Sequence, residues 1–137
     1  MRRIVLDTNC LLQALPSRSP YHKIWTEILA GNIVLCVNTD ILSEYEEIIG
    51  QKTNAEIARN VVEAIARLHT TEFLEVYYHF GLIEADADDN KFVDCAVIAG
   101  ATYIVSNDRH FRELQEYDFP KVDVRTLTEF LDIVRTL

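Results

Sequence analysis

The sequence has few of the features that mark membrane-spanning, secreted or disulfide-stabilised proteins. Its 137 residues contain no run of 18 apolar residues, which predicts that no transmembrane helix is present. The apolar run after Met1-Arg2-Arg3 is too short for a secretory signal, so we expect a cytoplasmic protein. Cys10, Cys36 and Cys95 are odd in number and widely spaced, which favours buried free thiols over a disulfide framework or zinc site. The four histidines show no metal-ligand spacing.

Positive charge is also scarce. The chain has 22 acidic residues against 13 lysines and arginines, and a formal net charge of −9. This balance argues against nucleic-acid binding through a broad basic surface. It is compatible with an enzyme whose acids bind hard divalent cations, which can bridge to phosphate, and it suits a basic protein partner. With 49% hydrophobic residues, the sequence predicts one compact domain over residues 1–137.

Short apolar runs of strand type alternate with amphipathic helical patterns along nearly the whole chain. Strands are predicted at residues 3–8, 33–37, 72–78, 103–105 and 122–124. Helical segments are predicted at residues 11–15, 21–30, 38–50, 54–69, 89–99 and 129–137, with a cap at 126–128. The proline- and serine-rich segment 16–20 is the clearest break. This alternation predicts an α/β fold in which a parallel sheet of four or five strands carries helices on both faces.

Two of the predicted strands are followed by a carboxylate. Asp7 lies at the carboxyl end of the first strand, and Asp108 ends the Ser-Asn-Asp sequence that follows the strand at 103–105. Ligands of open α/β sheets bind outside the carboxyl ends of the strands. The helix before the second of these strands should run antiparallel to it, which brings Asp89 at the helix start to the same edge. We therefore expect Asp7, Asp89 and Asp108 to face one cleft.

Each of these acids also has a purely structural interpretation. Asp7 and Asp108 lie in sequences that favour turns, where aspartate is common. Asp88 and Asp89 can cap the helix and complement its dipole; in one division of roles, Asp88 caps while Asp89 points into the cleft. Asp94 lies about 140° around the helix from Asp89, which leaves it as an outer metal ligand or an exposed acid.

Glu44 is a further candidate on the helix that follows the second strand. It lies one turn into that helix, close to the carboxyl edge of the sheet, but Glu46 and Glu47 are equally charged neighbours. A solvated helix face is therefore the alternative to a site residue.

If these acids gather in one pocket, a single function can explain all of them. Several carboxylates together repel one another, and folding would raise the pKa of some of them. With no lysine expected among their immediate neighbours, Mg²⁺ or Mn²⁺ would stabilise the cluster most simply, because these ions prefer oxygen ligands. The reaction class that follows is metal-dependent phosphodiester hydrolysis.

Four short motifs together resemble the PIN domain, and more narrowly the small VapC-like toxin components of bacterial and archaeal toxin–antitoxin pairs. In chain order they are Val-Leu-Asp-Thr-Asn at 5–9, Ser-Glu-Tyr at 43–45, Asp-Asp-Asn-Lys-Phe-Val-Asp-Cys-Ala at 88–96, and Ile-Val-Ser-Asn-Asp at 104–108. The resemblance covers essentially the whole chain. It implies a three-layer α/β/α fold that cuts single-stranded RNA with four acids around Mg²⁺ or Mn²⁺.

The resemblance also implies roles for individual residues. By position, the four catalytic and metal-binding acids are Asp7, Glu44, Asp89 and Asp108. Asp88 is an adjacent alternative for the third acid, and Asp94 is a supplementary one. Asn9 and Ser106 match polar positions that orient the acids or a metal-bound water.

The implied function is an endoribonuclease that forms the toxin half of such a pair. Its partners would be an RNA substrate and a small basic antitoxin that inserts a positive side chain near the acids; no membrane partner is expected. The sparse positive charge near the cleft makes Arg109, Lys91, Arg18 and Arg112 the expected phosphate contacts. A homodimer is expected because it is the commonest symmetric assembly. The alternatives are a non-catalytic PIN-fold binding module and a nuclease that processes structured RNA or DNA.

Overall fold

The computed structural model describes residues 2–75, 90–111 and 122–136. In this part of the chain, five parallel strands form one sheet in the order β3-β2-β1-β4-β5. The strands are β1 (Arg2–Leu6), β2 (Ile33–Val37), β3 (Glu72–Phe73), β4 (Tyr103–Val105) and β5 (Val124–Arg125). The predicted α/β class with a central parallel sheet is therefore confirmed.

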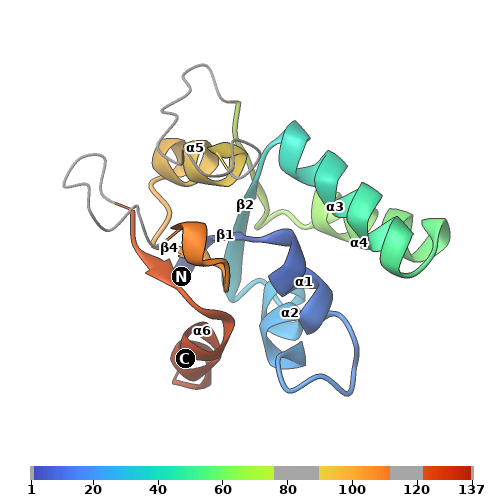
Figure 1. Cartoon of the computed structure of the whole chain (residues 1–137), viewed down its shortest axis with the longest axis horizontal. Helices are drawn as coiled ribbons and strands as arrows, with labels where there is room; N and C mark the ends of the chain where they lie inside the picture. Colours follow the sequence, from blue (N-terminus) through green and yellow to red (C-terminus); the bar gives the residue numbers. More distant parts are fainter. Residues whose placement is uncertain (1, 76–89, 112–121, 137) are drawn as a thin grey trace.

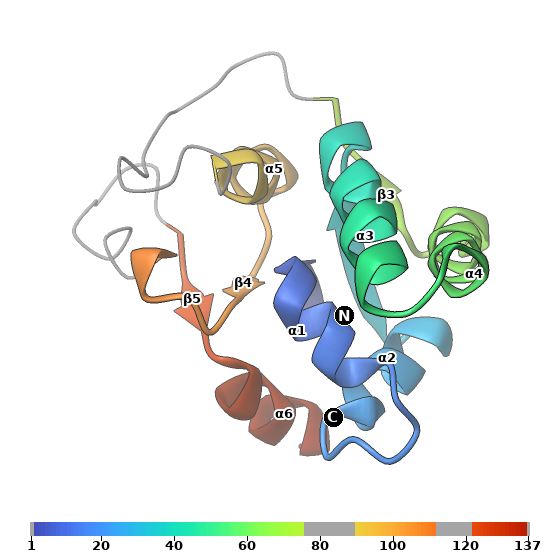
Figure 2. The same cartoon turned by 45° about the vertical axis from the view of Figure 1, so that its right-hand side comes forward.

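The helices cover both faces of this sheet. They are α1 (Thr8–Ala14), α2 (His22–Leu29), α3 (Thr39–Lys52), α4 (Ala55–Arg67), α5 (Asn90–Ala99) and α6 (Leu127–Arg135). Helix α5 lies on one side of the strands, and α2 and α6 lie on the other (Figures 1 and 2). Helices α3 and α4 pack against each other beside β2 (Figure 1). Within the described ranges, no helix combines the length and apolarity needed to cross a bilayer.

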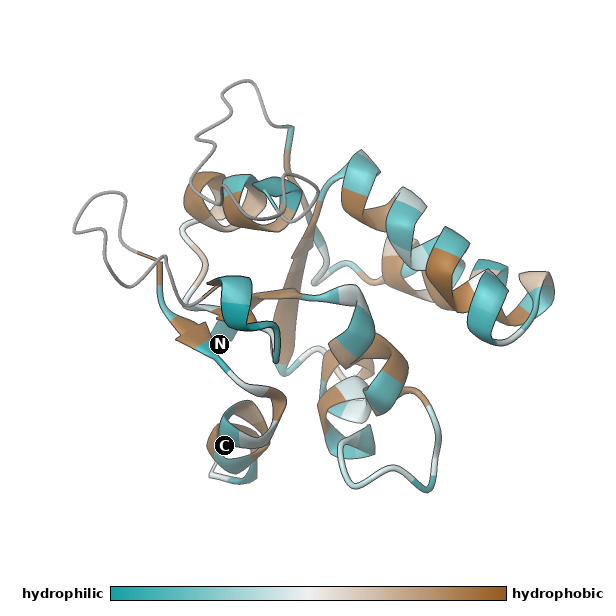
Figure 3. Ribbon diagram, viewed as in Figure 1, coloured by the Kyte–Doolittle hydropathy of each residue, from teal (hydrophilic) through white to brown (hydrophobic). Residues whose placement is uncertain are grey.

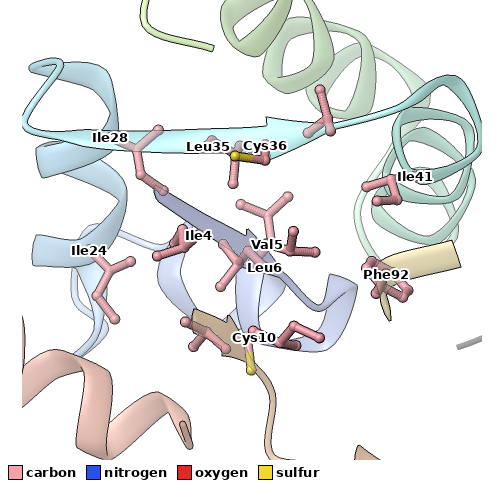
Figure 4. Close-up of a cluster of buried hydrophobic side chains, with 14 of the residues drawn as sticks. Ile4, Val5, Leu6, Cys10, Ile24, Ile28, Leu35, Cys36, Ile41 and Phe92 are labelled. Atoms are coloured by element: carbon pink, nitrogen blue, oxygen red, sulfur yellow. The ribbon is translucent and has the colours of Figure 1, made fainter. Parts of the chain in front are cut away.

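Strand β1 is the centre of the hydrophobic core. Its residues Ile4, Val5 and Leu6 are fully buried, with Ile24 of α2 on one side and Phe92 of α5 on the other (Figure 4). Hydrophobic residues gather on the strands and the inner helix faces, whereas the outer helix faces are mostly hydrophilic (Figure 3). An uninterrupted apolar run is what a strand covered on both faces requires.

The three cysteines are buried free thiols, as predicted. Burial raises the pKa of Cys10 and Cys95 to about 12 and the pKa of Cys36 to about 11. They therefore remain neutral thiols at neutral pH and behave as small core residues.

Several element boundaries differ from the prediction. Helix α3 continues to Lys52 instead of ending at Gly50, because Gly50 does not adopt the positive φ of a glycine that ends a helix. Helix α6 begins two residues earlier than predicted, because Thr126 is its N-cap and forms a reciprocal capping box with Glu129. The strand predicted to continue to residue 78 is described only at Glu72–Phe73, and residues 76–89 lie outside the described part.

Candidate functional site

The site is built on the carboxyl ends of the adjacent parallel strands β1 and β4. Leu6 is level with Val105 in the sheet, so the residues that follow the two strands, Asp7 and Ser106, come side by side. The Asp7 amide donates to the Val105 carbonyl oxygen at 3.0 Å. Ser106 Oγ donates to Asp7 Oδ2 at 2.8 Å and accepts from the Asp108 amide at 3.0 Å. One serine hydroxyl therefore connects both strand-end acids.

Glu44 reaches the same edge from α3. The hydroxyl group of Thr8 donates a hydrogen bond to Glu44 Oε2, and Thr8 directly follows Asp7 in the chain. The neighbouring Tyr45 is fully buried and donates its hydroxyl to the Leu6 carbonyl oxygen. These two contacts fix the start of α3 against the end of β1. They place Glu44 beside Asp7 and not on a solvated helix face.

The electrostatics link the three acids. Asp7 is 8% exposed. Burial raises the pKa of the Asp7 carboxyl group, the negative charges of Glu44 and Asp108 raise it further, and the hydrogen bond from Ser106 partly opposes them. Burial and the nearby Asp7 charge likewise raise the pKa of Tyr45 well above its ordinary value. The charges of Glu44 and Asp108 thus both act on the buried carboxyl group of Asp7.

An open pocket of ≈ 500 Å³ adjoins two of the three acids; its described lining residues are Asp7, Asn9, Leu12, Gln13, Asn107 and Asp108. The exposed Asn9 stands on the first turn of α1, so the predicted polar residue does share a pocket with the acids. Asn107 and Asp108 also line a second hollow of ≈ 370 Å³ that extends toward Arg125 and Glu129. Asn107 and Asp108 therefore border both recesses.

Some residues at this edge were missed by the sequence reasoning. The side chain of Asn107 accepts the Leu127 amide at 2.9 Å, which ties the strand end to α6. The His110 amide donates to Asp108 Oδ1 at 2.9 Å, and the ring Nδ1 lies 3.4 Å from the same oxygen. Thr8 and Asn107 stand in the motifs that contain Asp7 and Asp108, whereas the only sequence signal of His110 was its place two residues after Asp108.

The α5 side of the site differs from the prediction. Asp88 and Asp89 lie outside the described residues. Asp94, for which an exposed position was one alternative, is 1% exposed, so that alternative is wrong. It follows Lys91 by three residues, a spacing that puts two side chains on the same helix face.

The expectation that no lysine lies near the acids is also wrong. Lys91 Nζ lies 2.8 Å from Glu44 Oε1, which makes it the partner of an acid in addition to a candidate phosphate contact. Arg18 and Arg109 are exposed, and neither is among the described residues that line the two recesses. Arg112 lies outside the described part of the chain.

The donor set can be compared with what a hard cation needs. In the described ranges, no three Asp, Glu, His or Cys side chains are gathered closely enough to form a ready-made metal site. The donors at this edge are nevertheless mostly oxygen atoms, which suit Mg²⁺ and Mn²⁺. Burial and repulsion by the other acids raise the pKa of Asp7. The positive charge of a bound divalent cation would favour the ionised carboxylate and so oppose both effects. The oxygen donors present therefore fit such an ion in chemistry.

Fold and site together define a class: a doubly wound parallel α/β domain with an acidic site at the carboxyl ends of its central strands. Within that class, residues 3–110 match the sequence model of a PIN domain family. The chain therefore belongs to the PIN-domain family, as its motifs predicted. No curated protein matches the chain.

Two crystal structures with the same fold are complexes. One is VapBC2 from Rickettsia felis bound to a DNA fragment from its promoter, with a TM-score of 0.62 and 15% identity, covering 90% of this chain and 98% of that one. The other is DNA-bound VapBC from Salmonella typhimurium, with a TM-score of 0.57 and 17% identity, covering 93% and 99%. At these identities the similarity establishes the shared fold.

Proposed function

We propose that this protein is a metal-dependent endoribonuclease that hydrolyses phosphodiester bonds of single-stranded RNA. The observation that carries the proposal is the buried Asp7, which is held by Ser106 and repelled by Glu44 and Asp108 beside an open pocket. A solvated turn residue would experience neither that burial nor that repulsion. Membership of the PIN family supports the same reaction class.

The proposed roles follow from the contacts. Asp7 and Asp108 would hold Mg²⁺ or Mn²⁺, which would supply a bound water of lowered pKa and positive charge for the phosphate. Ser106 keeps both acids in register, since its hydroxyl contacts both residues. Asn9 faces the same pocket and orients water or substrate there. Glu44 adds negative charge from α3.

A fourth acid comes from the α5 side of the site. Asp89 is the residue that the sequence motif favours, and Asp88 is its adjacent alternative. Asp94 is the acid of α5 within the described residues, and it is buried on the helix face that carries Lys91. Mutation can separate the three candidates, because each is replaced by asparagine with little change in volume.

We further propose that the protein is the toxin of a toxin–antitoxin pair and acts in the cytoplasm. Two proteins of the same fold were crystallised as VapBC complexes, which supports an antitoxin partner. The net charge of −9 favours a basic antitoxin, because opposite charge speeds and orients association. A homodimer, the commonest symmetric assembly, is the proposed oligomer.

One observation favours a second candidate, a non-catalytic binding module of the same fold. Both oxygens of Glu44 have partners, and Asp108 Oδ1 accepts the His110 amide in a local turn. In such a module the acids would serve the structure alone. Replacing one of these acids would then change the stability of the protein, and there would be no catalytic activity to lose.

The decisive experiment is cleavage of a mixed RNA pool by the purified protein with Mn²⁺, Mg²⁺ or chelator, followed by mapping of the new ends. We expect cleavage at defined positions with either ion and none with chelator. Asp108→Asn should abolish it, whereas Asp132→Asn, which removes an exposed acid from α6, should not. Cleavage that persists in chelator or in Asp108→Asn would rule out the proposed site, and no cleavage under any condition would favour the binding module.

Positive charge next to Asp108 should govern RNA affinity. Arg109→Ala is expected to raise KM more than it lowers kcat, because a phosphate contact contributes to ground-state and transition-state binding alike. The salt dependence of binding should also flatten, by a slope of roughly 0.7 for each lost single-strand contact. Fluorescence anisotropy with labelled RNA across a salt series, with Ca²⁺ replacing the active ion, measures this change.

Arg18→Ala tests the second candidate contact, and Arg59→Ala on the exposed surface of α4 is the matched control. Unchanged affinity and salt slope in both Arg109→Ala and Arg18→Ala would place the RNA elsewhere.

A further inference from the structure

Lys91 brings a positive charge into the acidic edge from the first turn of α5. Its Nζ lies 2.8 Å from Glu44 Oε1, and the two side chains are only 19% and 25% exposed. The same ammonium lies 5.4 Å from the centroid of the Phe92 ring, whose side chain is fully buried. This pair is therefore partly shielded from water. A charge interaction in such a place is stronger than at a fully exposed surface.

The other oxygen of Glu44 is also engaged, because the Thr8 hydroxyl donates to Oε2. Glu44 thus faces a cation on one side and a hydroxyl donor on the other. Among the ion pairs of the described residues, neither Asp7 nor Asp108 has a lysine or arginine partner; Asp7 accepts a hydrogen bond from Ser106, and Asp108 contacts His110. The acidic edge therefore divides into a lysine-paired side at Glu44 and a side at Asp7 and Asp108 that adjoins the open pocket.

We propose that Lys91 is a tethered cation that takes the place of a second divalent ion at Glu44. The chain then binds one divalent ion on the Asp7 and Asp108 side, while Glu44 acts through Lys91 and stays outside the metal coordination. This inference rests on the proposed metal-dependent function and adds to it a metal count and a positioning role for Lys91.

The alternative role for Lys91 predicts the opposite result. If Lys91 only orients Glu44 toward a metal ion, removing the lysine should weaken metal binding. If Lys91 occupies an ion's place, removing it should free an uncompensated carboxylate beside Asp7 and so attract a second ion. The sign of the change therefore separates the two roles without any measurement of activity.

The experiment is a titration with Mn²⁺ in the absence of RNA, in which electron paramagnetic resonance of the free ion gives the number of ions bound. The variants are Lys91→Met, which keeps the apolar stem of the side chain, Lys91→Arg, which keeps the charge, and the double variant Lys91→Met with Glu44→Gln. We expect one bound ion in the parent protein. In Lys91→Met we expect a second ion, or binding at least about tenfold tighter, because a nearby like charge is removed.

Lys91→Arg should resemble the parent, and the double variant should lose the gain of Lys91→Met. Circular dichroism checks that each variant is folded. Two ions in the parent, unchanged or weaker binding in Lys91→Met, or no binding in any variant would each overturn the inference. Cleavage of RNA by the parent protein separates the role of Lys91 from the proposed nuclease function. If the parent is active but the ion count and affinity are unchanged in Lys91→Met, only the role of Lys91 is wrong. Inactive protein with the expected ion counts removes only the nuclease function.

Discussion

Asp7→Asn is expected to stabilise the metal-free protein at neutral pH and, in the same molecule, to abolish RNA cleavage and the response to Mn²⁺. Burial and the charges of Glu44 and Asp108 raise the pKa of Asp7 in the folded state above its ordinary value of 3.8. The folded state therefore holds the proton more tightly than the unfolded state does. Ionised Asp7 destabilises the fold, and asparagine removes that charge at nearly constant volume.

The pH dependence follows from the sign of this shift. Below pH 3.8 the carboxyl group is protonated in both states, and the two proteins should have similar melting temperatures. As pH rises, the unfolded state ionises first, so the stability of the parent falls relative to that of Asp7→Asn. The difference becomes constant once the pH exceeds the raised pKa of the folded state. Thermal unfolding in chelator from pH 3 to pH 8 measures it.

Mn²⁺ should reverse the order of stability. An ion present at 100 times its Kd stabilises the folded state by about 2.7 kcal/mol, and Asp7→Asn should lack most of that gain. The cleavage rate should fall about thousandfold or more, because a catalytic metal supplies several kcal/mol of transition-state stabilisation. Asp132→Asn, which replaces an exposed acid on α6, is the matched control and should respond to Mn²⁺ as the parent does. A parent-like response in Asp7→Asn would place the ion elsewhere.

The strand-end part of this site was predictable because it depends on local sequence and on the topology of parallel sheets. Uninterrupted apolar runs identified β1 and β4, and the residue after each strand must lie at the carboxyl edge. Adjacent pairing of the two strands then brings Asp7 and Ser106 together. No detail of side-chain packing is needed for that argument.

The pairing of Lys91 with Glu44 was not predictable in this way. It depends on how α3 and α5 pack across the end of β1, and hydrophobic periodicity gives no information on that contact. Gly50 is a similar case. Its sequence context favours a helix end, but the helix continues through it to Lys52 beside Ala58 of α4.

The exposed position that was one alternative for Asp94 is wrong for a geometric reason. Its direction was estimated relative to Asp89, on the assumption that Asp89 faces the cleft. The described part of α5 gives a better reference, because Lys91 contacts Glu44 on α3. Three residues turn a helix by 300°, so Asp94 lies within about 60° of Lys91 around the axis. Its burial agrees with this inward direction.

Asp94→Asn is therefore expected to lower the rate of RNA cleavage by about tenfold or more while the protein stays folded. Asp94 is 1% exposed on the face of α5 that carries Lys91. An acid there can act as a further metal-binding group or orient one, and loss of an outer-shell group alone costs about 10- to 100-fold.

The comparison that decides the matter uses three single variants: Asp94→Asn, Asp89→Asn and Asp88→Asn. Each is measured for cleavage rate, for stabilisation by Mn²⁺ and for melting temperature in chelator. If Asp94 supplies the fourth acid, its variant alone loses both cleavage and part of the Mn²⁺ response. Asp88→Asn should stay active, because asparagine caps a helix about as well as aspartate. Full activity in Asp94→Asn together with loss in Asp89→Asn would return the role to the residue that the sequence motif favours, and leave Asp94 as a buried structural acid.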